Sequence, residues 1–454
     1  MLSKRTSQAG RLIGLMLIVI SAFTVFAQDD AVTLDVIGLT VPPDEIGTPL
    51  DISRQEFITD FHEANPTITI NAIEAPPEFD TQIIIDLAAG TAPDVWYQGS
   101  GNLPNLVAAE GILDVSVCLD LVPELTLDRF DPNFLSIHQQ GDALWGLPDG
   151  GTPMVMYYNP ETFANAGIDE PSMDWTWDDF LTTMQELTLD SAGRNRLDPE
   201  FDEENIVQYG FRVRNFLFEW IYFVWQNGGD VISPDGTTVD GYLNSPETIE
   251  AITFLRDLVL EYGVAPSPSA LDQLNQQFGF LTAFLQGDVA MFARGHWEMV
   301  GLRNNEIYTE DRVNIVANPR NVEAATVIYE SGWVLNAALA DDPVRLEAAC
   351  TLIEGLTDVQ FQSSKVISGL EISANVEAAA AAVEVSEYPE ISERFVMALA
   401  DGRADYATRF AGWAVLVEEP INLMMENILA GGDIQEEVDI TVEEINRELE
   451  RANR

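Results

Sequence analysis

Strand-like runs alternate with helical patterns from residue 29 onward, and this alternation constrains the fold more than any other feature of the chain. Val32–Leu39 is a short apolar run typical of a strand. The next segment has helical spacing until Asn65, where Pro66 stops it because the residue before a proline leaves the α region. Further strand-like runs cover residues 67–74 and 93–97. Strands that alternate with helices predict an α/β fold.

Capping residues predict where several helices begin and end. We expect Asp80 to cap the start of a helix that ends before Gly90, where a left-handed backbone is least costly for glycine. Ser245, which a proline follows, predicts the start of a second long helix. Thr441 and Glu444 have the spacing of a capping box and predict the start of a C-terminal helix.

The first 27 residues have the pattern of a secretory signal peptide, with basic residues, the apolar run Leu12–Phe26 and a small residue at Ala27. The apolar run is shorter than the roughly 20 residues that a membrane-spanning helix needs. No cysteine lies at the predicted cleavage point after Ala27, so we expect no lipid anchor there. The sequence predicts an exported protein, in the periplasm or at the extracellular face of the membrane, and its remaining length favours two domains.

The chain is strongly acidic, because 75 Asp and Glu residues oppose 22 Lys and Arg residues and give a formal net charge of −53. Nucleic acid is excluded as a partner, since binding to phosphates depends on basic side chains. The excess carboxylates are expected on a solvated surface, where they favour solubility.

Cys118 and Cys350 are the only cysteines. Export permits a disulfide between them, but both lie in apolar segments that also suit buried thiols. The sequence leaves both states open.

Residues for catalysis or metal binding do not gather in any recognisable spacing. The histidines, His62, His138 and His296, lie far apart in the sequence, which argues against a zinc site. No G-x-S-x-G elbow and no phosphate-binding loop is present. We therefore expect no catalytic residue, no metal and no cofactor.

Tryptophan is the residue type that indicates a kind of ligand, and the chain has nine tryptophans. A flat aromatic ring suits the apolar C–H face of a sugar, while Asp, Asn, Gln and Arg suit its hydroxyl rim. A single tryptophan is more often a core residue, so these rings favour a sugar only as a group.

Several separate motifs occur in an order that resembles a known family. They include "LAAGTAPDVWY", "ALWGLPDGGTPMVMYYNPETFANAGI", "FLQGDVAMFARGHW" and "ESGWVLNAAL". In this order the chain resembles the extracellular solute-binding proteins of ABC importers, in the sugar-binding family 1 group that includes maltose-binding protein. The resemblance covers nearly the whole chain beyond the signal peptide.

The resemblance implies a two-lobe fold of the periplasmic-binding-protein type II, in which each lobe is a mixed sheet flanked by helices and hinge strands join the lobes. Lobe 1 would comprise residues 28–148 and about 315–375, and lobe 2 would comprise residues 149–314 and about 376–454. Pro148–Pro153 has the composition of a hinge. The implied function is to capture a carbohydrate in the cleft between the lobes and deliver it, as a monomer, to an ABC permease and its ATPase.

The same resemblance implies which residues contact the ligand. The expected aromatic contacts are Trp297, Trp413, Trp220 and Trp333, with Phe218 as an alternative to Trp220. The expected polar contacts are Gln98, Asn102, Asp149 and Thr152. Arg294 and Arg409 are further candidates, either as donors to a sugar or an acidic substituent or as surface charge balance.

Two other classes of function remain open at this point. A secreted carbohydrate-active hydrolase would bind similar ligands, but with so many acidic residues a pair of carboxylates carries little information. A binding protein for a polyamine or a glycerol phosphate would share the fold.

Overall fold

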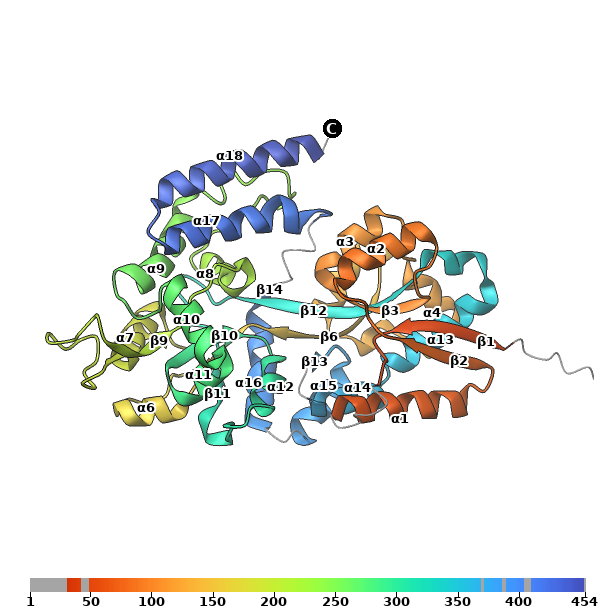
Figure 1. The fold of residues 1–454 in the computed structure, drawn as a ribbon. Coiled ribbons are helices and arrows are strands. Elements are labelled where there is room, and N and C mark those ends of the chain that lie inside the picture. The colour runs from red at the N-terminus through yellow and green to blue at the C-terminus, as the bar shows by residue number, and fades with distance from the viewer. Residues whose placement is uncertain (1–30, 42–48, 369–370, 386–388, 404–409, 453–454) are drawn as a thin grey trace, which may run out of the picture.

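The structure, a computed structural model, describes residues 31–41, 49–368, 371–385, 389–403 and 410–452. It forms two lobes of helices packed on β-sheets, joined by long strands that run between them (Figure 1). The expected signal peptide and Arg409 lie outside the described residues. The α/β expectation is confirmed.

The first lobe is built on a seven-stranded sheet with the order β13-β6-β12-β3-β1-β2, in which β14 also pairs with β12. Strand β1 is parallel to β2 and β3, whereas β12 is antiparallel to β3 and β6. The strands span β1 Val32–Ile37, β2 Ile68–Ile73, β3 Val95–Gly99, β6 Leu147–Pro153, β12 Thr326–Leu335, β13 Ile372–Ser373 and β14 Gly402–Arg403.

The second lobe is built on a five-stranded sheet with the order β11-β7-β10-β9-β8. Strands β9 and β10 are parallel, so their carboxyl ends lie at the same edge of the sheet. The strands span β7 Val155–Tyr158, β8 Leu189–Asp190, β9 Ile206–Phe211, β10 Val289–Arg294 and β11 Asn314–Val316, and a separate hairpin pairs β4 Gln139–Gln140 with β5 Ala143–Leu144.

Helices cover both sheets (Figure 1). Those packed in the first lobe are α1 Pro49–Ala64, α2 Phe79–Ala89, α3 Leu103–Ala108, α4 Cys118–Leu121, α5 Pro132–His138, α13 Pro343–Leu356 and α14 Val359–Ser368. Those of the second lobe are α6 Pro160–Ala166, α7 Trp177–Leu187, α8 Ile221–Gln226, α9 Pro246–Leu260, α10 Pro268–Phe278, α11 Phe280–Gln286, α12 Glu298–Arg303, α17 Glu419–Leu429 and α18 Ile434–Ala452. Helix α15, Val376–Val385, packs on both α14 and α16, Pro389–Ala398.

Strand pairing locates the change from one sheet to the other. Strand β6 stays paired with β12 through Pro153, five residues beyond the expected boundary at residue 148, and the chain then enters β7 of the second sheet. Strand β11 pairs with β7 and so belongs to the second sheet, although the expected first lobe resumed at about residue 315. The expected hinge segment, Pro148–Pro153, therefore lies within a fully buried strand whose end leads into the second lobe.

Each lobe has its own apolar core. Leu34, Val36 and Val95 of β1 and β3 pack with α13 in the first lobe, and Phe180, Phe211 and Trp225 belong to the larger core of the second. A disulfide joins Cys118 of α4 to Cys350 of α13 across 232 residues of sequence. The structure thus decides the question that the two apolar sequence contexts left open.

Local capping rules are confirmed at some helix ends and wrong at others. Gly90 adopts the left-handed backbone, with φ of 70°, at the end of α2, and the Ser245 side chain accepts from Thr248 N at the start of α9. The predicted capping box at Thr441 is wrong, because α18 begins at Ile434 and the Thr441 hydroxyl donates to a carbonyl one turn earlier within the helix.

Asp80 also has a different role from the predicted one. Glu78 occupies the N-cap position of α2, and no side chain caps that helix. The Asp80 carboxylate instead accepts from Gln98 Nε2 at 2.8 Å and from Asn102 Nδ2 at 3.3 Å. A long-range contact has replaced the local one.

Candidate functional site

The two lobes meet where β6 and β12 lead from one sheet toward the other (Figure 1). These strands are antiparallel, with Tyr329 opposite Thr152. Just beyond Pro153, Met154 donates its backbone N–H to Val327 O at 3.0 Å before the chain enters the second sheet. Side chains near this crossing can therefore contact groups of both lobes.

Three partly exposed rings gather at the crossing, and we call Phe218, Trp297 and Tyr329 the aromatic cluster. Tyr329, on β12, is 37% exposed. Its ring centroid lies 5.6 Å from that of Trp297, with the planes at 65°, and 5.8 Å from that of Phe218. The cluster combines one ring from a crossing strand with two from the second lobe, and it offers apolar surface to a solute at the junction.

The position of Trp297 depends on the glycine two residues earlier. A Cβ atom at Gly295 would lie 2.2 Å from Trp297 Cζ3, so the indole ring can fold over this backbone only because residue 295 has no side chain. The carbonyl of Gly295 is held in turn by the Tyr157 hydroxyl, which donates to it at 2.9 Å. Of the four tryptophans that the sequence singled out, Trp297 is the one that the structure leaves partly exposed.

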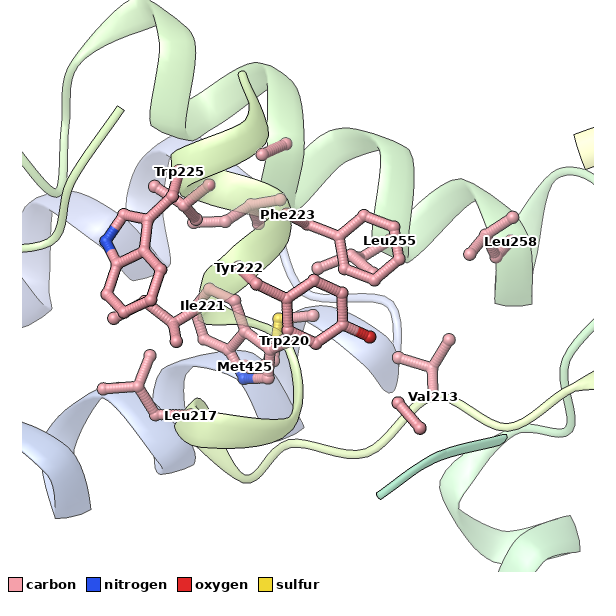
Figure 2. Packing of buried hydrophobic residues seen from close by; sticks show 14 of the residues in the cluster. Val213, Leu217, Trp220, Ile221, Tyr222, Phe223, Trp225, Leu255, Leu258 and Met425 are labelled. Carbon is pink, nitrogen blue, oxygen red and sulfur yellow. The ribbon is translucent and has the colours of Figure 1, made fainter. Parts of the chain in front are cut away.

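The other three tryptophans are buried. Trp220, Trp333 and Trp413 are 1%, 2% and 2% exposed. Figure 2 shows Trp220 in the core of the second lobe near Tyr222 and Met425, and its indole N–H donates to Asn215 O at 3.1 Å. In this conformation these rings have no exposed face for a ligand, and their role as ligand contacts stays a prediction.

Asp149 lies in a buried ionic network behind the crossing. Its carboxylate accepts from Trp333 Nε1 at 2.8 Å and from Gln362 Nε2 at 2.6 Å, and it pairs with Lys365. Lys365 Nζ also lies 2.9 Å from Glu371 Oε1. Buried charges need such compensation, so these contacts stabilise the attachment of α14 to β6. Asp149 is fully buried, and direct contact with a ligand stays a prediction.

Tyr97 closes this network on the side of β3. Its hydroxyl donates to Glu371 Oε1 at 3.0 Å. Burial, with the nearby charge of Glu371, raises the pKa of Tyr97 well above its usual value, so the phenol stays protonated. Burial also lowers the pKa of Lys365, although the charge of Glu371 opposes this effect. The network contains one of the two lysines of the chain.

Thr152 joins the crossing strand to the end of β10. Its hydroxyl accepts from His296 N at 2.8 Å and donates to Pro153 O at 3.0 Å. His296 packs edge-on against Phe395, and burial, together with the charge of Arg303, lowers its pKa to about 3. Thr152 thus holds the segment that carries Trp297, whereas its predicted contact with a ligand stays untested.

Gln98 and Asn102, at the carboxyl end of β3, are brought together by Asp80. Both amides are buried, and Asp80 itself is exposed. Asn105 donates to Asn102 Oδ1 at 2.9 Å and accepts from Gly412 N, in the segment before α17, at 2.8 Å. This polar group therefore reaches from the first lobe to the second, a link that the sequence analysis missed because it joins residues more than 300 positions apart.

Three arginines surround one carboxylate near the carboxyl ends of β9 and β10 in the second sheet. Glu219 pairs with Arg212 at 3.1 Å, Arg214 at 2.5 Å and Arg294 at 2.8 Å. Arg294 also pairs with Glu298 at 3.1 Å. Arg294 had been singled out from the sequence, whereas the spacing of Arg212 and Arg214 along the chain carried no signal for their convergence.

The described residues include no group of three His, Cys, Asp or Glu side chains placed to hold a metal ion. Within the same residues, none of the helices combines the length and the apolar character that crossing a bilayer would require.

Two sheet-and-helix lobes, crossing strands and an aromatic cluster at their junction define the class of two-lobe solute-binding proteins. The chain belongs to the bacterial extracellular solute-binding protein family, whose model matches residues 56–393. The class implied by the sequence resemblance is confirmed.

Curated relatives are similar over about half of their length. A putative binding protein of Brucella abortus is 27% identical over 237 residues, which cover 51% of this chain and 51% of the relative. An arabinooligosaccharide-binding protein of Halalkalibacterium halodurans is 23% identical over 250 residues, or 54% of this chain and 51% of the relative. The chain therefore spans about half the length of the relatives it matches.

Solved structures share the whole fold. An ABC substrate-binding protein of Listeria monocytogenes in complex with cycloalternan superposes with a TM-score of 0.75 at 19% identity and covers 92% of this chain and 98% of its own. The sugar-binding protein MalE of Xanthomonas citri superposes with a TM-score of 0.72 at 17% identity, over 93% and 98% of the two chains. At these identities the likeness establishes the fold.

Proposed function

We propose that this protein captures a carbohydrate between its lobes and delivers it to the permease of an ABC importer. The observation that carries the proposal is the aromatic cluster, in which Tyr329 of a crossing strand meets Trp297 and Phe218 of the second lobe. Partly exposed rings at a junction of two lobes suit the apolar faces of a sugar. The arabinooligosaccharide-binding relative and the sugar-bound neighbours support the same solute class.

Polar groups near the junction would read the hydroxyl rim of the sugar. Asp80 presents an exposed carboxylate held by Gln98 and Asn102 on the first lobe. Glu298 and Arg294 flank Trp297 on the second. A sugar touching both sets would bind the closed arrangement better than the open one, and this difference in affinity is what shifts the balance toward closure.

The crossing strands are the element that would bend during closure. The chain changes sheet between Pro153 and Val155 on one strand, and β12 begins at Thr326 on the other. The Asn105–Gly412 hydrogen bond links the lobes away from the crossing, so it would help to hold the closed state. A permease and its ATPase would then recognise the closed surface of a monomer exported to the periplasm or the outer face of the membrane.

The proposal is for binding without turnover. The relatives and neighbours that resemble this chain are binding proteins, which favours this reading. A sugar recovered unchanged after prolonged incubation would support binding, whereas released products would support the hydrolase alternative.

The test is a thermal-shift screen of mono- and oligosaccharides, with a polyamine and glycerol phosphate included. A sugar at 100 times its dissociation constant should add about 2.7 kcal/mol to the free energy of unfolding. Trp297→Ala should abolish the shift while the variant stays folded, and Tyr242→Ala, a partly buried ring outside the cluster, is the control. A shift with the polyamine or the phosphate but with no sugar contradicts the proposal.

A further inference from the structure

Beside the aromatic cluster lies an open pocket of about 370 Å³, and its charge is opposite to that of the chain as a whole. It is lined by Arg212, Arg214, Leu271, Asn275, Phe280, Leu281, Arg294 and Glu298. Arg294 ends β10 and Glu298 follows Trp297, so the pocket and the cluster share the same edge of the second sheet. In a chain with a net charge of −53, three converging arginines are an arrangement that needs an explanation.

The charges of this pocket do not balance. Arg212, Arg214 and Arg294 face the carboxylates of Glu219 and Glu298, which leaves one positive charge uncompensated. Arg214 also lines a neighbouring pocket with Asp272 and Glu426, whose carboxylates oppose the binding of an anion on that side. They disfavour a ligand group with two negative charges more than a group with one, so the pocket suits a single carboxylate.

The side chain of Arg212 has one N–H donor, on Nε, that makes no hydrogen bond to the described residues. The residue is 6% exposed, and its guanidinium lies 3.8 Å above the ring of Phe280. Its Nη2 bonds Glu219, but its buried Nε has no hydrogen-bond partner among the described residues. A buried donor without an acceptor costs free energy, and an anion in the pocket would remove that cost.

We infer that this pocket is a subsite for the carboxylate of an acidic sugar, so that the solute is a saccharide bearing a uronic acid. Planar guanidinium groups match the geometry of a carboxylate, and charge-assisted hydrogen bonds are the strong ones. The inference rests on the proposed function, because it places the acidic group next to a sugar ring on Trp297. It narrows the solute from carbohydrates in general to acidic saccharides, which aromatic stacking alone does not distinguish from neutral ones.

The test compares matched sugars by calorimetry: di- and trisaccharides containing glucuronic or galacturonic acid, and their neutral glucose and galactose counterparts. We expect the uronate of the preferred pair to bind about tenfold more tightly or better than its neutral counterpart. Raising the salt concentration should reduce this preference, since the interaction is between charges.

Variants of the arginines then test whether the preference for the uronate arises in this pocket. Arg214→Gln should lower uronate affinity toward that of the neutral sugar and leave neutral-sugar affinity close to its wild-type value. Arg294→Gln should lower the affinity for both sugars, but the affinity for the uronate more, because Arg294 also flanks Trp297. Arg320→Gln, which removes a surface ion pair with Asp174, is the matched control and should change neither. Two variants are used so that misfolding of one, checked by melting temperature, does not remove the test.

The outcomes separate this inference from the proposed function. Equal or weaker binding of the uronate, or an unchanged preference in both folded arginine variants, overturns the inference and leaves sugar binding standing. Absence of binding by every neutral and acidic sugar overturns both.

Discussion

The indole of Trp297 meets the phenol of Tyr329 edge-on, with ring centroids 5.6 Å apart, although Tyr329 lies on a strand of the first sheet and Trp297 lies 32 positions earlier at the start of α12, in the second lobe. Tyr329 lies on a strand that pairs with β3 and β6 of the first sheet, and Trp297 lies three residues beyond the end of β10, a strand of the second. This contact places an aromatic surface where a relative movement of the lobes would change its exposure.

Gly295→Ala should weaken sugar binding. A Cβ atom there would lie 2.2 Å from the Trp297 ring, so the ring must move and the stacking surface is lost. A loss of about 1 kcal/mol of stacking corresponds to about fivefold weaker binding of the best sugar from the screen. Isothermal titration calorimetry measures the change, with Gly355→Ala, where the added Cβ meets only ordinary contacts from Phe57 and Phe61, as the control. Unchanged affinity would show that Trp297 does not contact the sugar.

Lys365→Met should lower the free energy of unfolding by about 3–5 kcal/mol, because it leaves Asp149 and Glu371 buried without their cation. Adding Asp149→Asn should recover part of this loss, since an amide oxygen can still accept from Trp333 Nε1. Urea denaturation measures both variants. Arg320→Gln removes an exposed ion pair and should cost no more than about 1 kcal/mol. If Lys365→Met and Arg320→Gln lower the free energy of unfolding by similar amounts, the buried network contributes no more than a surface ion pair.

Acid should destabilise the protein through His296. Burial lowers the pKa of this imidazole from 6.5 to about 3 in the folded state, so only the unfolded chain takes up the proton between these values. The contribution of His296 to stability is therefore present above pH 6.5 and falls by up to about 1.4 kcal/mol per pH unit as the pH is lowered toward 3. The difference in unfolding free energy between wild type and His296→Gln, measured by denaturation at pH 7, 5.5 and 4.5, should shrink as the pH falls. A constant difference would contradict the shift.

Replacing both cysteines by alanine should lower the free energy of unfolding by about 2–5 kcal/mol, because the Cys118–Cys350 bridge closes a loop of more than 200 residues. Sugar affinity should remain unchanged, since α4 and α13 lie in the core of the first lobe away from the aromatic cluster. Urea denaturation measures the change in the free energy of unfolding, and calorimetry without denaturant measures sugar affinity. A large loss of affinity in the folded variant would show that the bridge positions the binding surface.

The secondary structure was largely predictable because its signals are local. Pro66 follows the last helical turn of α1, Gly90 provides the left-handed end of α2, and Ser245 caps α9. The two wrong predictions, the capping roles of Thr441 and Asp80, also relied on local spacing alone. Thr441 has the spacing of a cap but lies inside α18, and Asp80 bonds Gln98 and Asn102 rather than the nearest helix end.

The sequence by itself determined the class of the chain, since alternating strands and helices and the order of several motifs depend only on residue types along one dimension. The family resemblance also placed Trp297 among the expected ligand contacts. Only the tertiary structure decided which aromatic rings keep an exposed face, that Tyr329 joins them and that three arginines meet Glu219. Exposure and charge pairing depend on what distant segments place over each side chain: Trp220 and Trp333 are as aromatic as Trp297, but other parts of the chain cover them.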